Sequence, residues 1–168
     1  MRKSYKLAVF RNMIHNALIN KEQTDTNYNL VFDYLRNSGY IVRSRDGYVE
    51  TEDGIEGKLK EIVAPIEEGD IVWERLSGTF LVLDKRPKIN DDGHHFRVIK
   101  VTPTVDGSYT INGETRSVII EDRYLLRIRH SSFDMTEINK LSFERYQLYA
   151  KIADVNTSLC KMKEKKHG

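Results

Sequence analysis

The sequence predicts an α+β protein built from a helical pair with a β-hairpin, a small antiparallel β-barrel and a long C-terminal helix. Three changes of pattern indicate this class. Apolar residues recur at helical steps before residue 40, form short strand-like runs in the middle of the chain, and return to a heptad spacing near its end. We therefore expect domains at residues 1–57, 58–130 and 131–168.

The first part of the chain predicts two helices, at residues 4–21 and 27–37. The first has an apolar stripe formed by Leu7, Phe10, Ile14, Ala17 and Leu18. The second follows the cap formers Asp25 and Thr26, and Gly39 comes after it. Because glycine readily adopts the left-handed conformation that ends helices, we expect the second helix to end there.

A β-hairpin is expected at residues 40–51, where the apolar period changes to two. Asp46-Gly47 lies at its centre, and this pair tolerates the positive φ angles of a type I′ turn. The following stretch, residues 52–57, is acidic and contains two glycines. We expect a linker or an exposed loop at this stretch.

The middle of the chain contains five or six short apolar runs separated by turn signals, which is typical of a small barrel or open sandwich. Strands are expected at residues 71–73, 79–83, 96–101, 117–121 and 123–129. Pro103 ends the third of these strands or limits it to an edge, because proline cannot donate a ladder hydrogen bond.

The C-terminal segment has the clearest pattern in the sequence. Eight positions step by three and four residues: Ile138, Leu141, Arg145, Leu148, Ile152, Val155, Leu159 and Met162. We call the seven apolar members the seam. A helix beginning at Asp134 and running to Lys165 would be roughly 45 Å long, longer than a small barrel is wide.

A narrow apolar seam usually packs against another helix, although a stripe can also pack on its own domain. Phe143, Tyr146 and Tyr149 broaden the apolar face in the first half of the segment. We therefore expect the first half to dock on the barrel. The second half is expected to contact a second copy or another protein.

No residue pattern indicates catalysis, a cofactor or a metal. The acids Glu67, Glu68 and Asp70 fall in a predicted loop, where solvation is the simpler explanation. His94 and His95 are adjacent, so in a strand their rings would point to opposite faces. Neither a P-loop nor a dinucleotide-binding glycine motif is present. We expect a non-enzymatic protein.

A nucleic-acid-binding regulator is the alternative. The order helix, turn, helix and hairpin resembles part of a winged-helix layout, and Arg36, Arg43 and Arg45 would lie near the second helix and the hairpin. A winged helix normally has a third helix, which the sequence does not predict. A second basic stripe is expected along strand 123–129, although such charges are commonly just solvated.

Composition sets further bounds. The net charge of +2 does not produce a global field for polyanions. The single cysteine, Cys160, excludes an internal disulfide and favours either a reducing compartment or an assembly that does not need disulfides. The first apolar cluster, at residues 7–10, is too short for the core of a signal peptide, and no run is long enough to cross a membrane.

The barrel segment carries a resemblance to a known family. Gly69-Asp70 precedes an apolar strand, the next strand ends in Leu81-Val82-Leu83, and a polar loop leads to strand 96–101. This order resembles the head–tail connector or neck proteins of tailed phages. It implies an SH3-like barrel in a ring component without an active site. The same opening is similar to SH3-like toxin ribonucleases, which would imply an enzyme.

From these observations we expect a non-enzymatic, oligomeric structural protein of a tailed-phage particle. Its partners would be copies of itself or other particle proteins, joined through the seam, with nucleic acid as an alternative partner and no membrane. It would reside in the host cytoplasm or in the virion.

Overall fold

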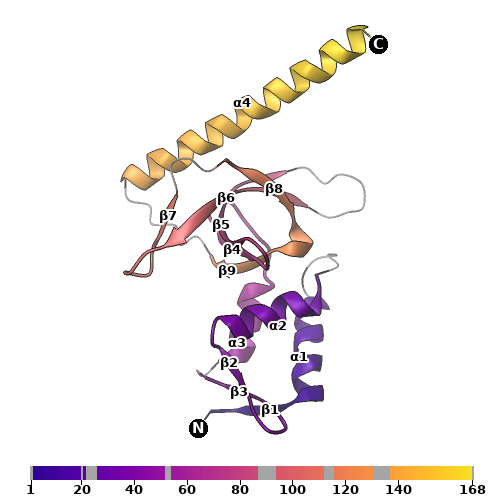
Figure 1. Ribbon diagram of the computed structural model, residues 1–168, viewed down its shortest axis with the longest axis vertical. Helices are drawn as coiled ribbons and strands as arrows, with labels where there is room; N and C mark the ends of the chain where they lie inside the picture. Colours follow the sequence, from indigo (N-terminus) through magenta and orange to yellow (C-terminus); the bar gives the residue numbers. More distant parts are fainter. Residues whose placement is uncertain are drawn as a thin grey trace.

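The computed structural model describes residues 2–19, 21, 26–51, 54–86, 94–111, 116–130 and 137–167. The α+β class is confirmed, because the described residues form four α-helices and two antiparallel sheets. In Figure 1 the N-terminal helices and their small sheet lie at the bottom, the barrel lies in the middle, and the long C-terminal helix crosses the top.

The N-terminal unit contains three strands and three helices. They are β1 (Ser4–Lys6), α1 (Leu7–Ile19), α2 (Tyr28–Asn37), β2 (Ile41–Arg43), β3 (Gly47–Glu50) and α3 (Ile55–Ile62). The sheet order is β1-β3-β2, with both pairs antiparallel. Residues 4–6 were expected to be helical; they form β1 instead, because Tyr5 pairs with Tyr48 on the free edge of β3.

The ends of α2 partly follow the sequence. Gly39 has φ 77°, so the left-handed stop is confirmed. The N-cap is Asn27, whose side-chain oxygen accepts a hydrogen bond from the backbone N–H of Asn29 at 2.8 Å. Of the two expected caps, Thr26 does not have this role and Asp25 lies outside the described residues.

Gly47 has a function that the turn pattern did not indicate. The hairpin is present, but Gly47 is the first residue of β3 and is not in the positive-φ region. A Cβ at this position would lie 1.9 Å from the carbonyl oxygen of Tyr5. Glycine is therefore required here for the close approach of β1, rather than for a type I′ turn.

Helix α3 corrects the linker expected at residues 52–57, since Ile55 already begins the helix. Its apolar residues Ile55, Leu59 and Ile62 are buried at helical spacing, while the residues between them are mostly charged. A domain boundary after residue 57 would fall inside this helix. The three-part division of the chain otherwise stays a prediction.

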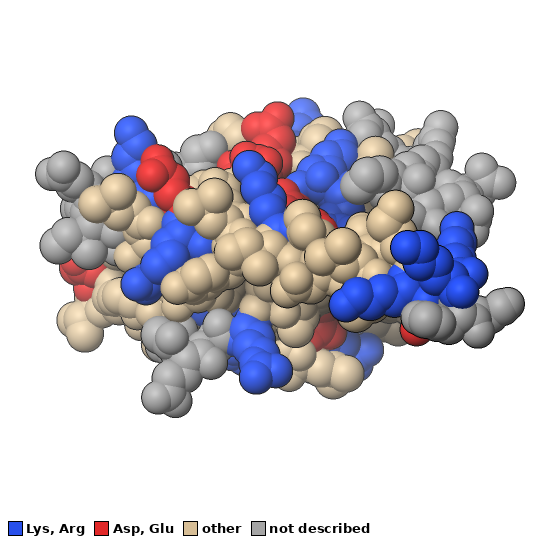
Figure 2. Space-filling model, turned by 90° about the horizontal axis from the view of Figure 1, so that it is seen from above, with Lys and Arg blue, Asp and Glu red and all other residues tan. Residues whose placement is uncertain are grey.

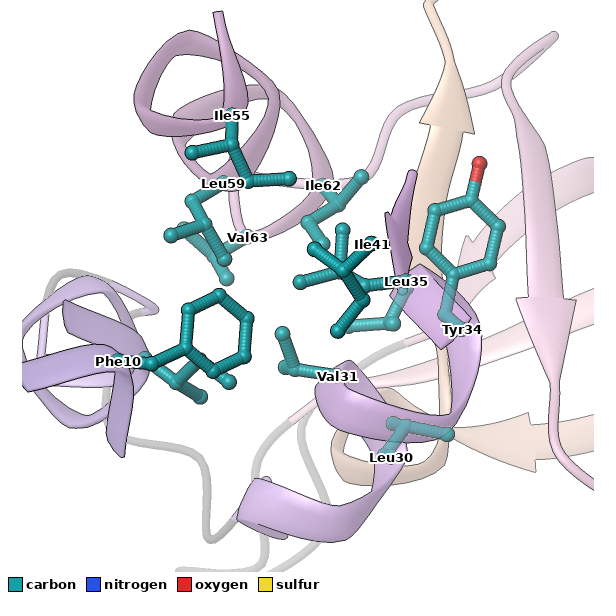
Figure 3. Close-up of a cluster of buried hydrophobic side chains, with 12 residues drawn as sticks. Phe10, Leu30, Val31, Tyr34, Leu35, Ile41, Ile55, Leu59, Ile62 and Val63 are labelled. Carbon is teal, nitrogen blue, oxygen red and sulfur yellow. The ribbon is translucent and has the colours of Figure 1, made fainter. Parts of the chain in front are cut away.

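The core of the N-terminal unit extends into the barrel. Figure 3 shows side chains from α1, α2, β2 and α3 converging on one cluster. Its buried members are Phe10, Ile14, Leu30, Val31, Tyr34, Leu35, Ile41, Ile55, Leu59, Ile62, Val63 and Leu126. Leu126 belongs to a barrel strand, and Trp73 and Ile128 of the barrel pack against the same cluster. The two units therefore share apolar packing.

The barrel consists of six strands and one 3₁₀ turn. They are β4 (Ile71–Glu74), β5 (Gly78–Arg86), β6 (His95–Pro103), β7 (Tyr109–Ile111), β8 (Val118–Glu121), η1 (Asp122–Tyr124) and β9 (Leu126–Arg129). The order is β7-β6-β5-β4-β9, and β8 also pairs with β6. Strand β8 lies at one edge of the sheet and β9 lies at the other edge, and the short turn η1 connects them. Because so few residues span only a short distance, the two edges must lie close together. The sheet is therefore rolled into a small SH3-like barrel.

Alternate residues of the central strands face two different apolar layers. On β5, Phe80 and Val82 pack on one side, and Leu81 and Leu83 pack on the other. The first layer also contains Leu125, between η1 and β9. The second layer is completed by aromatic residues of the C-terminal helix, α4 (Glu137–His167).

Helix α4 has 31 residues, about 46 Å of helix. Its expected N-cap, Asp134, lies outside the described residues. Figure 1 shows that α4 lies along the barrel with one part and extends past it with the other. Within the described residues, no helix combines the length and the apolar character needed to cross a membrane.

Candidate interaction surfaces

The first half of α4 docks on the barrel, as expected, although Tyr149, one of the three aromatic residues expected to broaden this face, is 56% exposed. Phe143, Tyr146 and Ala150 are buried at spacings of three and four residues, and the two rings complete the layer formed by β4, β5 and β6. The Gln147 side-chain amide donates a hydrogen bond to the Leu83 carbonyl oxygen at 2.7 Å. This set of residues defines the docking face of α4.

A charged clamp holds the helix at the end of the docking face. Arg97, only 4% exposed, donates two hydrogen bonds to the Asp154 carboxylate, at 2.6 and 3.1 Å. Arg86 donates two more, at 2.9 and 3.0 Å. Hydrogen bonds from Arg97 first, and then from Arg86, lower the pKa of Asp154 to about 2, against the effect of desolvation.

The seam lies on the opposite side of α4. Successive helical residues are about 100° apart, so the seam from Leu148 to Met162 is centred roughly 160° around the helix from the docking face. Six seam residues are 49% to 67% exposed: Leu141, Leu148, Ile152, Val155, Leu159 and Met162. The side chain of Ile138 lies outside the described residues. Packing on its own barrel therefore does not cover the seam.

Figure 2 looks down on this side of the molecule. Uncharged side chains run across the middle of the view, with lysine and arginine side chains beside them and gathered at one end. Arg145 lies at a seam position, with its guanidinium 5.6 Å from the ring centre of Tyr146. The uninterrupted apolar part is therefore Leu148–Met162, about 21 Å long.

The N-terminal cations form a second candidate surface. Arg36 and Arg43 are exposed, and their guanidiniums lie 5.5 Å and 5.3 Å from the ring centres of Phe32 and Tyr48. These rings are 5.2 Å apart, so the fold brings both arginines to one face. Arg45 is exposed in the turn between β2 and β3.

Sequence reasoning missed one member of this face. Arg11 of α1 is exposed and lies 5.5 Å from the ring centre of Tyr28, which stacks on Phe32 at 6.0 Å. No local pattern marks Arg11, because its position beside α2 depends on how the two helices pack.

The basic stripe expected along strand 123–129 is only partly present, because Arg123 lies in η1 and β9 carries only Arg127 and Arg129. Arg123 pairs with Glu121 at 2.7 Å, and Arg127 and Arg129 donate hydrogen bonds to the carbonyl oxygens of Glu61 and Gly107. These contacts leave this stripe a weaker candidate than the N-terminal face.

Asp70 is not the solvated loop acid that the sequence indicated. It is fully buried, its carboxylate accepts a hydrogen bond from the Glu67 backbone N–H at 2.8 Å, and its other oxygen lies 2.9 Å from Nδ1 of His130. This arrangement fixes the loop before β4. Among the described residues, no three His, Cys, Asp or Glu side chains are grouped to hold a metal ion.

Lys21 is a buried cation between the two units. Its Nζ donates hydrogen bonds to the hydroxyl of Thr26 at 2.8 Å and to the carbonyl oxygens of Asp122 and Leu125, at 2.9 and 2.6 Å. Burial lowers the pKa of Lys21 to about 8, although the Asp122 carboxylate at 3.5 Å opposes this effect. The contacts indicate a structural role.

Comparison with known proteins identifies no relative: no family model, no curated protein and no solved structure matches the chain.

Proposed function

We propose that this chain is a non-enzymatic structural protein that forms oligomers through the seam on α4. The observation that carries the proposal is the two-sided character of this helix. One side is used by the barrel, while the apolar residues on the other side remain about half exposed. An isolated exposed leucine is ordinary, but an ordered row of apolar side chains marks an interaction site.

The partner we propose is a second copy of the chain. The seam keeps the heptad spacing of helices that pack on one another, and a copy brings a matching seam. The uninterrupted part, Leu148–Met162, spans about two heptads, so its residues would form the centre of a helix pair or of a larger bundle.

We further propose that the assembly belongs to a tailed-phage particle, at the neck between head and tail. This setting rests on the resemblance of the barrel segment. Strands β4, β5 and β6 occupy the segments in which that resemblance expects strands. A barrel with an oligomerising helix suits a ring subunit, which needs a rigid body and a contact to its neighbour.

Light scattering of the full chain at low and high salt tests the proposal. We expect a mass of at least two chains that persists at high salt, because an apolar contact is not weakened by screening. A monomer at micromolar concentration in both conditions would refute self-association through the seam. An oligomer that dissociates in high salt would indicate a charged interface elsewhere.

A further inference from the structure

We propose that the N-terminal unit carries a binding surface for duplex DNA, formed by the exposed side of α2, Arg11 of α1 and the β2–β3 hairpin. This function is separate from oligomer formation and does not depend on the seam.

Arginine side chains from three elements gather on this face. Rings of Tyr28, Phe32 and Tyr48 follow one another with centres 6.0 Å and 5.2 Å apart. One guanidinium lies over each ring, contributed by Arg11, Arg36 and Arg43 respectively. Residues from α1, α2 and the hairpin therefore present three fixed positive charges together, which is what contact with a phosphate backbone requires.

The groove between α1 and α2 is basic in character. It is lined by Leu7, Ala8, Arg11, Asn12, Tyr28, Asn29, Phe32 and Tyr48, and none of these described residues is acidic. Asp33, the acid of α2, is buried and pairs with Arg75 at 2.7 Å, while its other oxygen lies 3.6 Å from the Arg36 guanidinium. Glu50 is buried as well, and it accepts hydrogen bonds from Lys3 N–H and the Tyr5 hydroxyl. Asp33 and Glu50 are therefore compensated by neighbouring groups, and the groove itself is lined by no described acid. The hairpin turn exposes one acid, Asp46, which lies beside Arg45.

The exposed side of α2 favours duplex DNA over single-stranded nucleic acid. Asn29 and Arg36 are exposed and lie seven residues apart, on one side of α2. Asparagine and arginine are the side chains that pair with the major-groove edges of adenine and guanine. Arg11 on one flank and Arg43 and Arg45 on the other are placed to contact phosphates while α2 enters the groove. Single strands are disfavoured because the guanidiniums already cover the rings on which bases would stack.

The topology agrees with this placement. Two helices are followed by a hairpin that β1 extends to three strands, and α3 packs on them as a third helix. The sequence did not predict the third helix that a winged-helix layout needs. The structure contains one, α3, which follows the hairpin and does not precede α1 and α2. In helix-turn-helix proteins the second helix reads the major groove.

Fluorescence anisotropy with a labelled 20-base-pair duplex, titrated with the full chain from 50 to 200 mM salt, tests the proposal. The variant Arg11→Gln/Arg36→Gln/Arg43→Gln should bind at least about tenfold more weakly at 100 mM salt. Its salt slope should fall by roughly 2, because Arg11 and Arg43 each lose a phosphate contact that contributes about 0.9. The matched control Lys151→Gln/Lys161→Gln/Lys163→Gln removes the same charge from exposed positions on α4 and should bind as the wild type does.

A second variant guards against misfolding of the first. Asn29→Glu adds a negative charge in the first turn of α2, where the helix dipole favours it, so folding should be retained while DNA binding is lost. The proposal is overturned if no duplex binding occurs at 50 mM salt, or if control and triple variant weaken equally. It is also overturned if single-stranded DNA or RNA of the same length binds more tightly than the duplex.

Discussion

Replacing Ile152 and Leu159 with Asp should dissociate the proposed oligomer while the barrel stays folded. Both side chains belong to the seam, are about half exposed and face away from the docking face. Burying a whole leucine or isoleucine is worth roughly 1.5–3 kcal/mol, so the exposed half of each contributes roughly 0.8–1.5 kcal/mol at an interface.

A dimer contains four such side chains, so their loss should cost about 3–6 kcal/mol. This corresponds to a dissociation constant raised by roughly 10² to 10⁴. Aspartate adds the penalty of bringing unpaired charges into the contact, so the estimate is a lower bound. Analytical ultracentrifugation over a concentration series measures this change directly.

The matched control is Thr157→Asp/Ser158→Asp, which adds the same charge to exposed positions of α4 outside the seam. Circular dichroism melting should show the same barrel transition in wild type, control and seam variant. Self-association through the seam is refuted if the seam variant keeps the wild-type mass, or if the control dissociates to the same extent.

Three further predictions concern folding. Buried Lys21 has a pKa of about 8 in the folded protein, against 10.5 for an ordinary lysine. Between pH 8 and pH 10 the unfolded chain therefore binds a proton at this lysine that the folded protein has released. The free energy of unfolding should rise over this range by up to about 1.4 kcal/mol per pH unit. Urea titrations of Lys21→Met should not show this rise. Above pH 10 the raised pKa of buried Tyr34 lowers the free energy of unfolding as the pH increases, so the titrations should end at pH 10. Asp154→Asn should destabilise docking of α4 by about 1 kcal/mol at pH 7, and this value is modest because the carboxylate is 42% exposed. The difference from wild type should shrink as the pH falls from about 4 to about 2, because wild-type Asp154 is protonated over this range. Gly47→Ala should lower the free energy of unfolding by about 1–3 kcal/mol, because the added Cβ displaces β1. Gly57→Ala in α3, where an added Cβ meets nothing within 4 Å, should raise it by about 0.5–1 kcal/mol. Equal effects at the two glycines would contradict the close approach of Tyr5 to Gly47.

Elements with a full apolar period were predictable from the sequence. The stripe of α1, the run of α2 before Gly39 and the steps of α4 each repeat often enough to identify a helix. Helix α3 was missed because it is only eight residues long and contains Gly57 among charged residues. Its buried residues become a pattern only when the core that they enter is known.

The candidate surfaces divide in the same way. The seam follows from spacing within one helix. The clamp joins Asp154 to Arg86 and Arg97, which are 68 and 57 residues away in sequence. No short stretch of sequence contains both sides of this contact, so it was not predictable. Asp154 lies on the same face of α4 as Phe143, Tyr146 and Ala150. An acidic residue at the end of an apolar helical face is the signal that could have indicated a charged contact there.

The clamp on Asp154 also fixes the rotation of α4 about its own axis. A helix held only by apolar packing can roll by some degrees, but two guanidiniums on one carboxylate permit little rolling. The direction in which the seam points, relative to the barrel, is then a fixed property of each subunit. If copies join through the seam, the angle between neighbouring barrels is determined in part by Arg86 and Arg97. Loss of the clamp would then alter the curvature of an assembly before it altered the affinity between its subunits.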